Sequence, residues 1–211
     1  MIIEETRKFV KNLLEKEGTG HDWWHIERVY QNALHIMEEE KCDEKKVKLA
    51  VLLHDIGDYK LHDGVDKTQE LVSDFLRKQS VSEDEVNSIL KIIKQISFSE
   101  NQNQKPDSIE AQIAQDADRL DAMGAIGIAR AFAYGGSKGR LLYHPDIEPE
   151  NYQNTAQYRI SQSPTINHFY EKLLLLKNTM NTEAAKKIAI NRHHFMEMYL
   201  EQFFEEWKGE R

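Results

Sequence analysis

The chain of 211 residues has a single cysteine, Cys42, and is poor in proline and glycine, with four and ten residues respectively. A single cysteine excludes an intramolecular disulfide and is typical of a reducing compartment. Few prolines and glycines leave long stretches of chain free to form helices. The sequence therefore favours a helical protein that folds without disulfides.

Long apolar segments are also absent. No stretch approaches the roughly 20 apolar residues that a membrane span requires. The N-terminal sequence MIIEETRKFVKNLLEKEG carries charges every few residues, where a signal peptide needs an apolar core. We therefore expect a soluble, cytoplasmic protein with no membrane partner.

An excess of basic charge is absent as well. The chain has 36 acidic and 28 basic residues, which gives a formal net charge of −8. Nucleic-acid-binding proteins rely on basic surfaces that neutralise phosphates, so we expect no nucleic-acid partner. A small phosphorylated substrate remains compatible, because a divalent ion and a few basic side chains can make one pocket positive.

What the sequence does contain is helical periodicity. Apolar residues recur at three- and four-residue intervals, which predicts helices. The predicted helices include residues 9–14, 26–37, 47–55, 71–76, 86–93, 113–133, 166–180 and 182–203. No alternating strand pattern persists. The prediction is an all-α fold in a single domain, residues 1–211, with core motifs at about 21–122 and C-terminal helices at 165–208 packed on them.

Polar residues interrupt one of these apolar stripes in LAVLLHDIGDYKLH. On a helix, Val51, His54 and Asp58 lie on one line, so the imidazole of His54 continues the buried face, with Asp55 beside it. Two polar groups beside a core face are costly unless a partner satisfies them. A divalent metal ion would satisfy both, since imidazole nitrogen and carboxylate oxygen are good ligands.

The same anomaly occurs on two other predicted helices. His25 heads a line with Val29 in GHDWWHIERVYQNALHI, and Asp118 lies on a line with Ala122 and Ala125 in AQIAQDADRLDAMGA. Inward-facing ligand types from helices far apart in sequence indicate a site in a helical core. Two imidazoles and two carboxylates, without thiolates, suit an octahedral ion with positions open for water and substrate.

Three motifs resemble, in the same order, those of the HD-domain metal-dependent phosphohydrolases, in particular the small bacterial members. They are HDWWHIERV, LLHDIGD and DADRLDAMGAIGIARAF. The resemblance extends through HFYEKLL and the final helix, so it covers nearly the whole chain. It implies a helical HD-domain bundle with the metal site in its core. It also implies that His25, His54, Asp55 and Asp118 bind one divalent metal ion.

Two of these ligand positions have competitors. His21 competes with His25 at the start of the same helix, and the position immediately before IERV favours His25. Asp116 and Asp121 compete with Asp118. The alanine line and the following Arg-Leu pair favour Asp118.

The resemblance also implies a water-activating carboxylate a few residues after the His-Asp pair. Asp58 matches this role, so the predicted catalytic residues are Asp58 and the metal ligand Asp55. Metal-bound water has a lowered pKa, and Asp58 would orient it or take its proton. The alternative is that Asp58 only begins a turn at the end of its helix.

An anionic substrate needs cationic anchors. Arg28 follows His25 by one turn, and Lys60 follows Asp58. Lys138 and Arg140 occur in YGGSKGR, where glycines let backbone N–H groups approach phosphate oxygens. For Arg28, pairing with an acidic residue of a neighbouring helix is an equal alternative.

Histidines elsewhere are expected to be structural. His62, His144 and His168 are predicted to lie in loops or on half-buried surfaces, and His193 and His194 on one face of the last helix. Adjacent histidines are not ligand spacing by themselves.

The function that the resemblance implies is metal-dependent hydrolysis of a nucleotide. The preferred reaction is that of a (deoxy)nucleoside triphosphate pyrophosphohydrolase, which releases a monophosphate and pyrophosphate. Manganese suits the ligands, and nickel, cobalt, iron, magnesium and zinc are alternatives. The alternative functions are a nucleoside monophosphate phosphatase, a guanosine tetraphosphate hydrolase and a non-catalytic, metal-stabilised nucleotide-binding scaffold. The small-residue helix at 122–133 packs either within the chain or across a homodimer.

Overall fold

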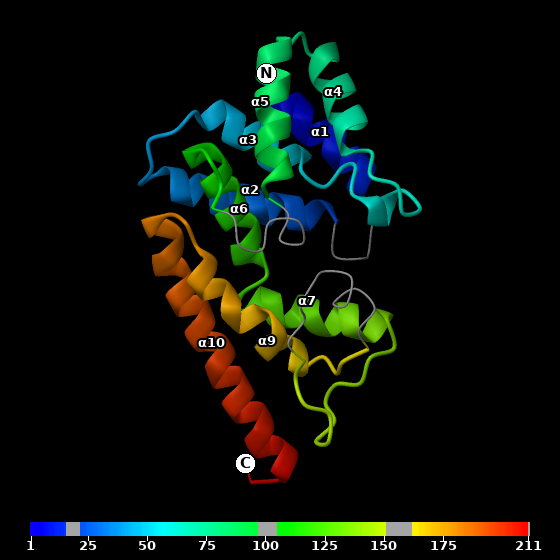
Figure 1. The fold of residues 1–211 in the computed structure, drawn as a ribbon, viewed down its shortest axis with the longest axis vertical. Helices are drawn as coiled ribbons and strands as arrows, with labels where there is room; N and C mark the ends of the chain where they lie inside the picture. Colours follow the sequence, from blue (N-terminus) through cyan, green and yellow to red (C-terminus); the bar gives the residue numbers. More distant parts are fainter. Residues whose placement is uncertain (16–21, 97–104, 151–161, 211) are drawn as a thin grey trace. The chain divides into compact units, whose positions relative to one another are not determined.

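The structure is a computed structural model that describes residues 1–15, 22–96, 105–150 and 162–210, with the side chain of Lys60 left out. Helices and the turns between them make up this part of the chain, and no strand occurs in it (Figure 1). The all-α prediction is confirmed. Among the described helices, none has the length and apolar character that a membrane crossing requires.

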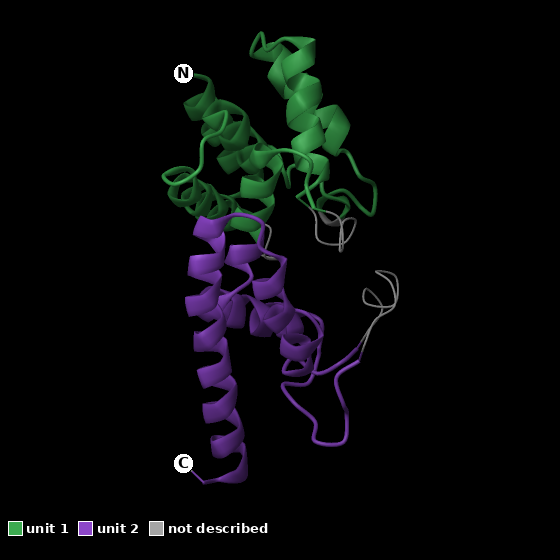
Figure 2. Ribbon diagram, turned by 60° about the vertical axis from the view of Figure 1, so that its left-hand side comes forward, with its two compact units in different colours: residues 1–118 green, residues 119–211 purple. Residues whose placement is uncertain are grey.

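The helices form two compact units, residues 1–118 and 119–211 (Figure 2). Such a grouping is compatible with one domain, and the single-domain assignment stays a prediction. The elements of the first unit are α1 (Ile2–Leu14), α2 (Trp23–Met37), α3 (Glu44–Leu53), the 3-10 turn η1 (Tyr59–Leu61), α4 (Thr68–Lys78), α5 (Glu83–Lys94) and most of α6 (Ile109–Asp121).

Helix α3 is the centre of the first unit. Helices α1, α2 and α5 all pack against it, and residues 49–53 have no exposed surface. This burial of an unbroken aliphatic run explains why a short helix of ten residues is stable here, since packing supplies most helical stability in proteins. The end of α3, where the His-Asp pair follows, is therefore rigidly placed.

Side-chain caps begin several of these helices, as the sequence pattern of such helix starts predicts. Asp22, Asp43 and Ser82 accept a hydrogen bond from the backbone N–H three residues later, at the starts of α2, α3 and α5. Thr182 does the same for α10. Each cap satisfies one of the N–H groups that a helix start leaves without an intrahelical partner.

The second unit contains α7 (Gly124–Ser137), α9 (Asn167–Glu171), the 3-10 helix η2 (Leu173–Thr179) and α10 (Glu183–Lys208). Helix α10 packs on α7 and η2. The single helix predicted over residues 166–180 is wrong, because the backbone at Lys172 leaves the helical region (φ −146°, ψ −57°). The tighter turns of η2 then place Leu173 and Leu176, three residues apart, on one buried side.

The single helix predicted over residues 113–133 is also wrong, since it breaks into α6 and α7. Gly124 adopts a left-handed conformation (φ +66°), which only glycine adopts readily. A Cβ atom at Gly127 would lie 2.3 Å from the carbonyl oxygen of Ala122. These small residues therefore build the turn between two helices. The predicted line from Asp118 does not continue to Ala125, which is exposed.

Candidate active site

His25 is placed by the cap that begins α2. The carboxylate of Asp22 accepts a hydrogen bond from the backbone N–H of His25 at 2.7 Å, which fixes the first helical turn. Val29 and Ala33 continue the same buried line, with no exposed surface. The imidazole of His25 follows this line into the interior, and its side chain is 2% exposed.

His54 and Asp55 stand where α3 ends. The helix stops at Leu53, so its predicted extension through Asp55 is wrong, although His54 keeps helical backbone angles (φ −63°, ψ −30°). Nδ1 of His54 lies 2.8 Å from the carbonyl oxygen of Val51. A carbonyl only accepts, so Nδ1 donates its proton, which leaves Nε2 as the ring atom that can bind a metal ion.

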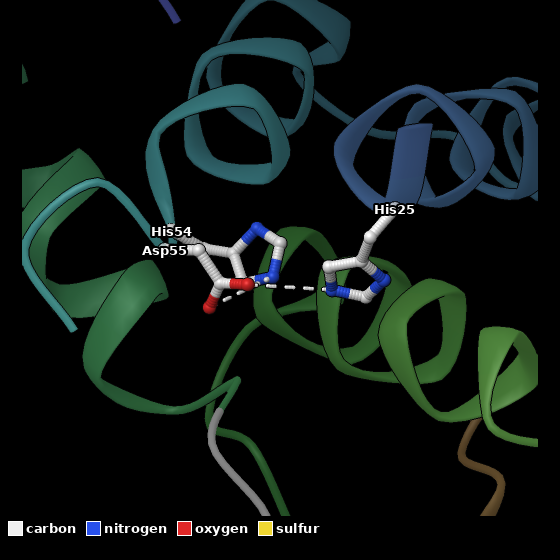
Figure 3. Close-up of side chains that lie close together, drawn as sticks. All are labelled: His25, His54 and Asp55. Carbon is white, nitrogen blue, oxygen red and sulfur yellow. Dashed lines mark ion pairs between the residues drawn. The ribbon is translucent and has the colours of Figure 1, made fainter. Parts of the chain in front are cut away.

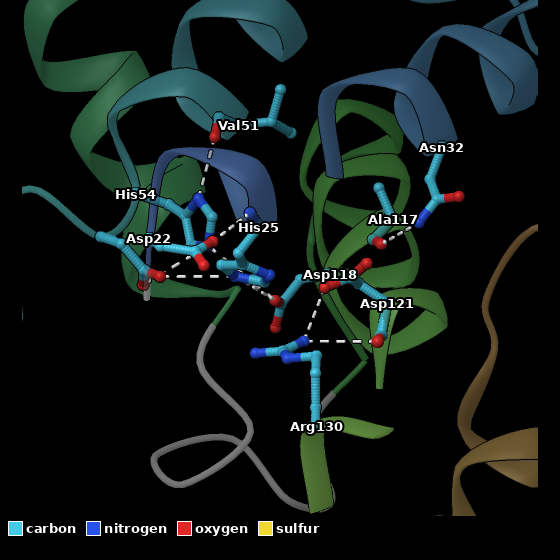
Figure 4. A network of polar contacts seen from close by, with 10 residues as sticks. Asp22, His25, Asn32, Val51, His54, Ala117, Asp118, Asp121 and Arg130 are labelled. Atoms are coloured by element: carbon cyan, nitrogen blue, oxygen red, sulfur yellow. Dashed lines mark hydrogen bonds and ion pairs between the residues drawn. The ribbon is translucent and has the colours of Figure 1, made fainter. Parts of the chain in front are cut away.

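Four side chains, which come from α2, from the end of α3 and from α6, meet in the first unit. Figure 3 shows His25, His54 and Asp55, with each imidazole Nε2 atom 3.4 Å from an oxygen of Asp55. Oδ1 of Asp118 lies 3.4 Å from Nε2 of His25 and 3.8 Å from Nε2 of His54 (Figure 4). Asp118 is the most accessible of the four, with 25% of its side chain exposed. We call these four residues the His-Asp cluster.

Hydrogen bonds from side chains fix α6, which carries Asp118. The amide of Asn32 on α2 donates to the carbonyl of Ala117 at 3.0 Å. The buried side chain of Gln115 donates to the carbonyl of Gln95, just after α5, at 2.7 Å. These bonds hold α6 to α2 and to the end of α5, so the position of Asp118 is set by the packing of three helices.

Asp118 is held in its ionised form. Burial acts to raise the pKa of its carboxyl group, but the hydrogen bond from His25 and the charges of His25 and His54 outweigh burial and lower the pKa below its usual value. At neutral pH the group is a carboxylate that only accepts. Its electrons are therefore available to a cation.

The His-Asp cluster fits a divalent metal ion. Nε2 of His54 is buried and makes no hydrogen bond to any residue that the structure describes, which is costly unless another partner uses its lone pair. Ligand bonds of about 2.1 Å place neighbouring ligand atoms about 3 Å apart, close to the separations in the cluster. His25, His54 and Asp55 thus form a candidate metal centre. The donor set, nitrogen and oxygen without sulfur, suits a divalent transition-metal ion.

The competing residues that the structure describes are not part of the His-Asp cluster. Asp116 is fully buried and lies about 200° around α6 from Asp118, so it points to another side. Asp121 pairs with Nη1 of Arg130 at 2.6 Å, within the second unit (Figure 4). His21 lies outside the described residues. Of the three carboxylates, the structure places only Asp118 beside the histidines.

The predicted catalytic residue Asp58 stands in the turn that follows α3. Its backbone N–H donates to the carbonyl of Asp55 at 3.1 Å, and its side chain is half-buried. Because the helix has already ended, Asp58 does not lie on a helical line with His54. One tight turn nevertheless carries both Asp55 and Asp58.

Two predicted anchors belong to the first unit. Arg28 is half-buried on α2, three residues after His25, and so projects from a neighbouring strip of the same helix. Lys60 lies in η1, and its side chain is outside the described residues.

The other two predicted anchors belong to the second unit. Lys138 and Arg140 follow α7, where Gly139 has a left-handed backbone (φ +67°). Nζ of Lys138 and Cζ of Arg140 lie 5.7 and 5.5 Å from the ring centre of Tyr134, within reach of a cation–π attraction. Two cations therefore gather at one aromatic ring. Their role in substrate binding stays a prediction.

Sequence reasoning missed the residues that support the cluster. The cap by Asp22 was detectable, because an aspartate three residues before His25 at a helix start is a standard signal. Asn32 gave no signal, since its partner lies 85 residues away. His62 was expected only in a loop or on a half-buried surface, yet its Nε2 lies 2.8 Å from the carbonyl of Ile56, between Asp55 and Asp58.

Comparison with known proteins gives consistent matches. The family model described as "HD domain" matches residues 23–123. YpgQ of Bacillus subtilis, an uncharacterised protein, is 38% identical over 208 residues, which cover 98% of this chain and 94% of YpgQ.

Solved structures match over the same length. The crystal structure of an HD-superfamily hydrolase from Bacillus thuringiensis is 46% identical, with a TM-score of 0.78, and the match covers 98% of this chain and 97% of that one. The crystal structure of Bacillus subtilis YpgQ in complex with ADP is 37% identical, also with a TM-score of 0.78, and covers 97% and 94% of the two chains.

Proposed function

Because the chain belongs to the HD-domain family of metal-dependent phosphohydrolases, we propose that it hydrolyses (deoxy)nucleoside triphosphates to a monophosphate and pyrophosphate. The observation that carries the proposal is the His-Asp cluster, in which two imidazoles and two carboxylates converge within 3.8 Å. A nucleotide substrate is supported by the relative YpgQ, which was solved with ADP. A triphosphate offers the bond whose cleavage releases pyrophosphate.

In this proposal the four residues of the cluster, His25, His54, Asp55 and Asp118, hold one divalent ion. Manganese is the preferred ion, because it accepts imidazole and carboxylate ligands and leaves positions for oxygen atoms. When bound, the ion supplies positive charge that polarises a phosphoryl oxygen and makes water more acidic. The carbonyl of Val51 orients His54 for this task through the bond to Nδ1.

Asp58 has the role of general base. Its carboxylate takes a proton from the attacking water, while Asp55, from the same turn, remains a ligand. The tight bond between the N–H of Asp58 and the carbonyl of Asp55 keeps the two carboxylates in a fixed relation. Such fixed placement supplies much of the rate in phosphoryl transfer.

Cationic side chains anchor the triphosphate. In the first unit the proposed anchors are Arg28 and Lys60, and in the second unit Lys138 and Arg140 stay predicted anchors. Arginine forms paired hydrogen bonds with phosphate oxygens, whereas lysine acts as a point charge. These four assignments extend the proposal from the reaction to the binding of its substrate.

A hydrolysis panel tests the proposal. Metal-stripped protein, reloaded with Mn²⁺, receives nucleoside mono-, di- and triphosphates in ribo and deoxy forms, and guanosine tetraphosphate. Phosphate and pyrophosphate are assayed separately. The variants are Asp55→Ala and, as a matched control, Asp74→Ala at an exposed position of α4.

The expected result is pyrophosphate from triphosphates, lost in Asp55→Ala and unchanged in Asp74→Ala. Phosphate released from monophosphates alone would replace the proposal by a phosphatase. Pyrophosphate from guanosine tetraphosphate alone would identify a hydrolase of that nucleotide. Protein that holds Mn²⁺ and turns over nothing would identify a scaffold.

A further inference from the structure

A histidine outside the His-Asp cluster holds the turn that carries Asp55 and Asp58. Nε2 of His62, which is half-buried, lies 2.8 Å from the carbonyl oxygen of Ile56. A carbonyl only accepts, so the imidazole donates its Nε2–H. Ile56 immediately follows Asp55, and its carbonyl belongs to the peptide that leads on to Gly57 and Asp58.

The next peptide of the turn is fixed as well. The carbonyl of Gly57 accepts a hydrogen bond from the backbone N–H of Lys67 at 2.9 Å. A Cβ atom at Gly57 would lie 2.1 Å from the backbone nitrogen of Thr68, so the two segments touch backbone to backbone. Two consecutive carbonyls between the two carboxylates are thus held by residues 62–67.

Backbone hydrogen bonds fix the turn that contains His62. Its N–H donates to the carbonyl of Tyr59 at 3.3 Å, and its own carbonyl accepts from Val65 at 3.0 Å. The left-handed residues Asp63 (φ 51°) and Gly64 (φ 87°) close this compact turn, and the N–H of Gly64 also donates to Tyr59 at 2.8 Å. A backbone built in this way leaves the imidazole little freedom to move away from Ile56.

We propose that His62 is a positioning residue, which fixes the directions of the Asp55 and Asp58 carboxylates by holding the carbonyl between them. It contacts neither carboxylate through an identified bond and acts through the backbone of the turn. Supporting groups of this kind typically change metal affinity or activity about 10- to 100-fold when they are removed. The part concerning Asp58 rests on the proposed function, whereas the part concerning Asp55 is tested by metal binding alone.

Two matched variants test the role of the donor. In His62→Gln the amide nitrogen occupies roughly the place of Nε2 and still donates, whereas in His62→Asn the side chain is too short to reach Ile56. Both variants remain polar and uncharged. His35→Asn, at an exposed position of α2, is the control for a histidine outside the turn.

Three quantities are measured for each variant: the Kd for Mn²⁺ of the metal-stripped protein by calorimetry, kcat and KM of the Mn²⁺-loaded enzyme, and Tm. For His62→Asn we expect a Kd about tenfold higher and a kcat about tenfold lower, with KM within about twofold. His62→Gln should recover most of both losses, and His35→Asn should match the wild type.

Equal losses in the Asn and Gln variants would overturn the proposal, because the donor would then be irrelevant. A lower Tm of His62→Asn with unchanged Kd and kcat would do the same and leave His62 a purely structural residue. If wild-type protein hydrolyses no nucleotide, the proposed function fails, but the Kd comparison still decides whether His62 positions Asp55.

A measurement on wild-type protein guards against a variant that does not fold. Long-range ¹H–¹⁵N NMR of the metal-stripped protein at pH 8 reports which ring nitrogen of His62 carries the proton. Protonated Nε2 and unprotonated Nδ1 are expected. The opposite tautomer cannot hold the Ile56 carbonyl and would overturn the proposal.

Discussion

Asp118 and Asp121 lie three residues apart in one motif of α6, yet they have different partners. Asp121 is 1% exposed and pairs with the guanidinium of Arg130 at 2.6 Å. Asp118 faces two imidazole nitrogens at 3.4 and 3.8 Å. The two carboxylates therefore have different surroundings: Asp121 contacts a cation of the protein, whereas Asp118 lies beside two imidazoles, where we propose that a metal ion binds.

The largest expected effect follows from a substitution of Asp118, the carboxylate beside the histidines. Asp118→Asn should lower kcat/KM of the Mn²⁺-loaded enzyme about 1,000-fold or more, because a neutral amide is a poor ligand and carries no charge. The free energy of unfolding of the metal-free protein should change by only about 1 kcal/mol, the usual value of one hydrogen bond. Steady-state kinetics and urea denaturation measure the two quantities. Full activity in the variant would remove Asp118 from the ligand set.

The next largest effect concerns Asp121 and its ion pair with Arg130. Asp121→Asn removes one partner of a buried ion pair and should lower the free energy of unfolding by about 3 kcal/mol, at the low end for such pairs because Arg130 is partly exposed. Under conditions where the variant is folded, kcat/KM should stay within about tenfold of the wild type. Urea denaturation of metal-free protein provides the measurement, and an unchanged midpoint would contradict it.

Adding metal distinguishes the roles of Asp118 and Asp121 in a single assay. Mn²⁺ at 100 times its Kd should raise the free energy of unfolding by about 2.7 kcal/mol, because it binds only the folded protein. Asp121→Asn should keep this increment, whereas Asp118→Asn should lose most of it. Denaturation with Mn²⁺ or with a chelator gives both values. An equal increment in both variants would place the metal elsewhere.

The smallest predicted effect concerns His168, a half-buried histidine near two cations. Burial lowers the pKa of His168 from 6.5 to about 3, helped by the charges of Lys172 and Arg140. The unfolded chain therefore takes up the proton first as the pH falls. The contribution to stability is complete above pH 6.5 and is lost as the pH falls towards 3.

At pH 5 this loss should reach about 2 kcal/mol relative to pH 7. In His168→Gln the fall in stability between pH 7 and pH 5 should be smaller by that amount. Urea denaturation at the two pH values measures it. An identical pH dependence in the two proteins would show that His168 titrates normally in the folded state.

The sequence predicted helices well where burial alone determines them. The lines through His25 and His54 correctly directed both imidazoles inward, because helical periodicity records which face is buried. Periodicity failed where helices break, between Asp121 and Gly124 and at Lys172, since such breaks depend on tertiary packing and on single backbone angles. Boundaries of this kind leave little trace in periodicity.

The sequence could only partly identify which carboxylate of α6 lies beside the histidines. Asp118 was preferred over Asp121 partly on an alanine line that the structure does not continue to Ala125. The deciding contact, between Asp121 and Arg130, crosses the unpredicted turn between α6 and α7. Asn32, which holds α6 through the carbonyl of Ala117, is still more remote in sequence. Partners of this kind become visible only in three dimensions.

Gly57 has a consequence for any survey of substitutions along this chain. Its missing side chain lets the turn after Asp55 touch the backbone at Thr68, so even alanine would push the two segments apart. A screen that scores every replacement by activity would rank Gly57 with the proposed metal ligands, although glycine brings no chemistry to the site. Intolerance of substitution marks the places where the chain has no spare volume as readily as those where it reacts.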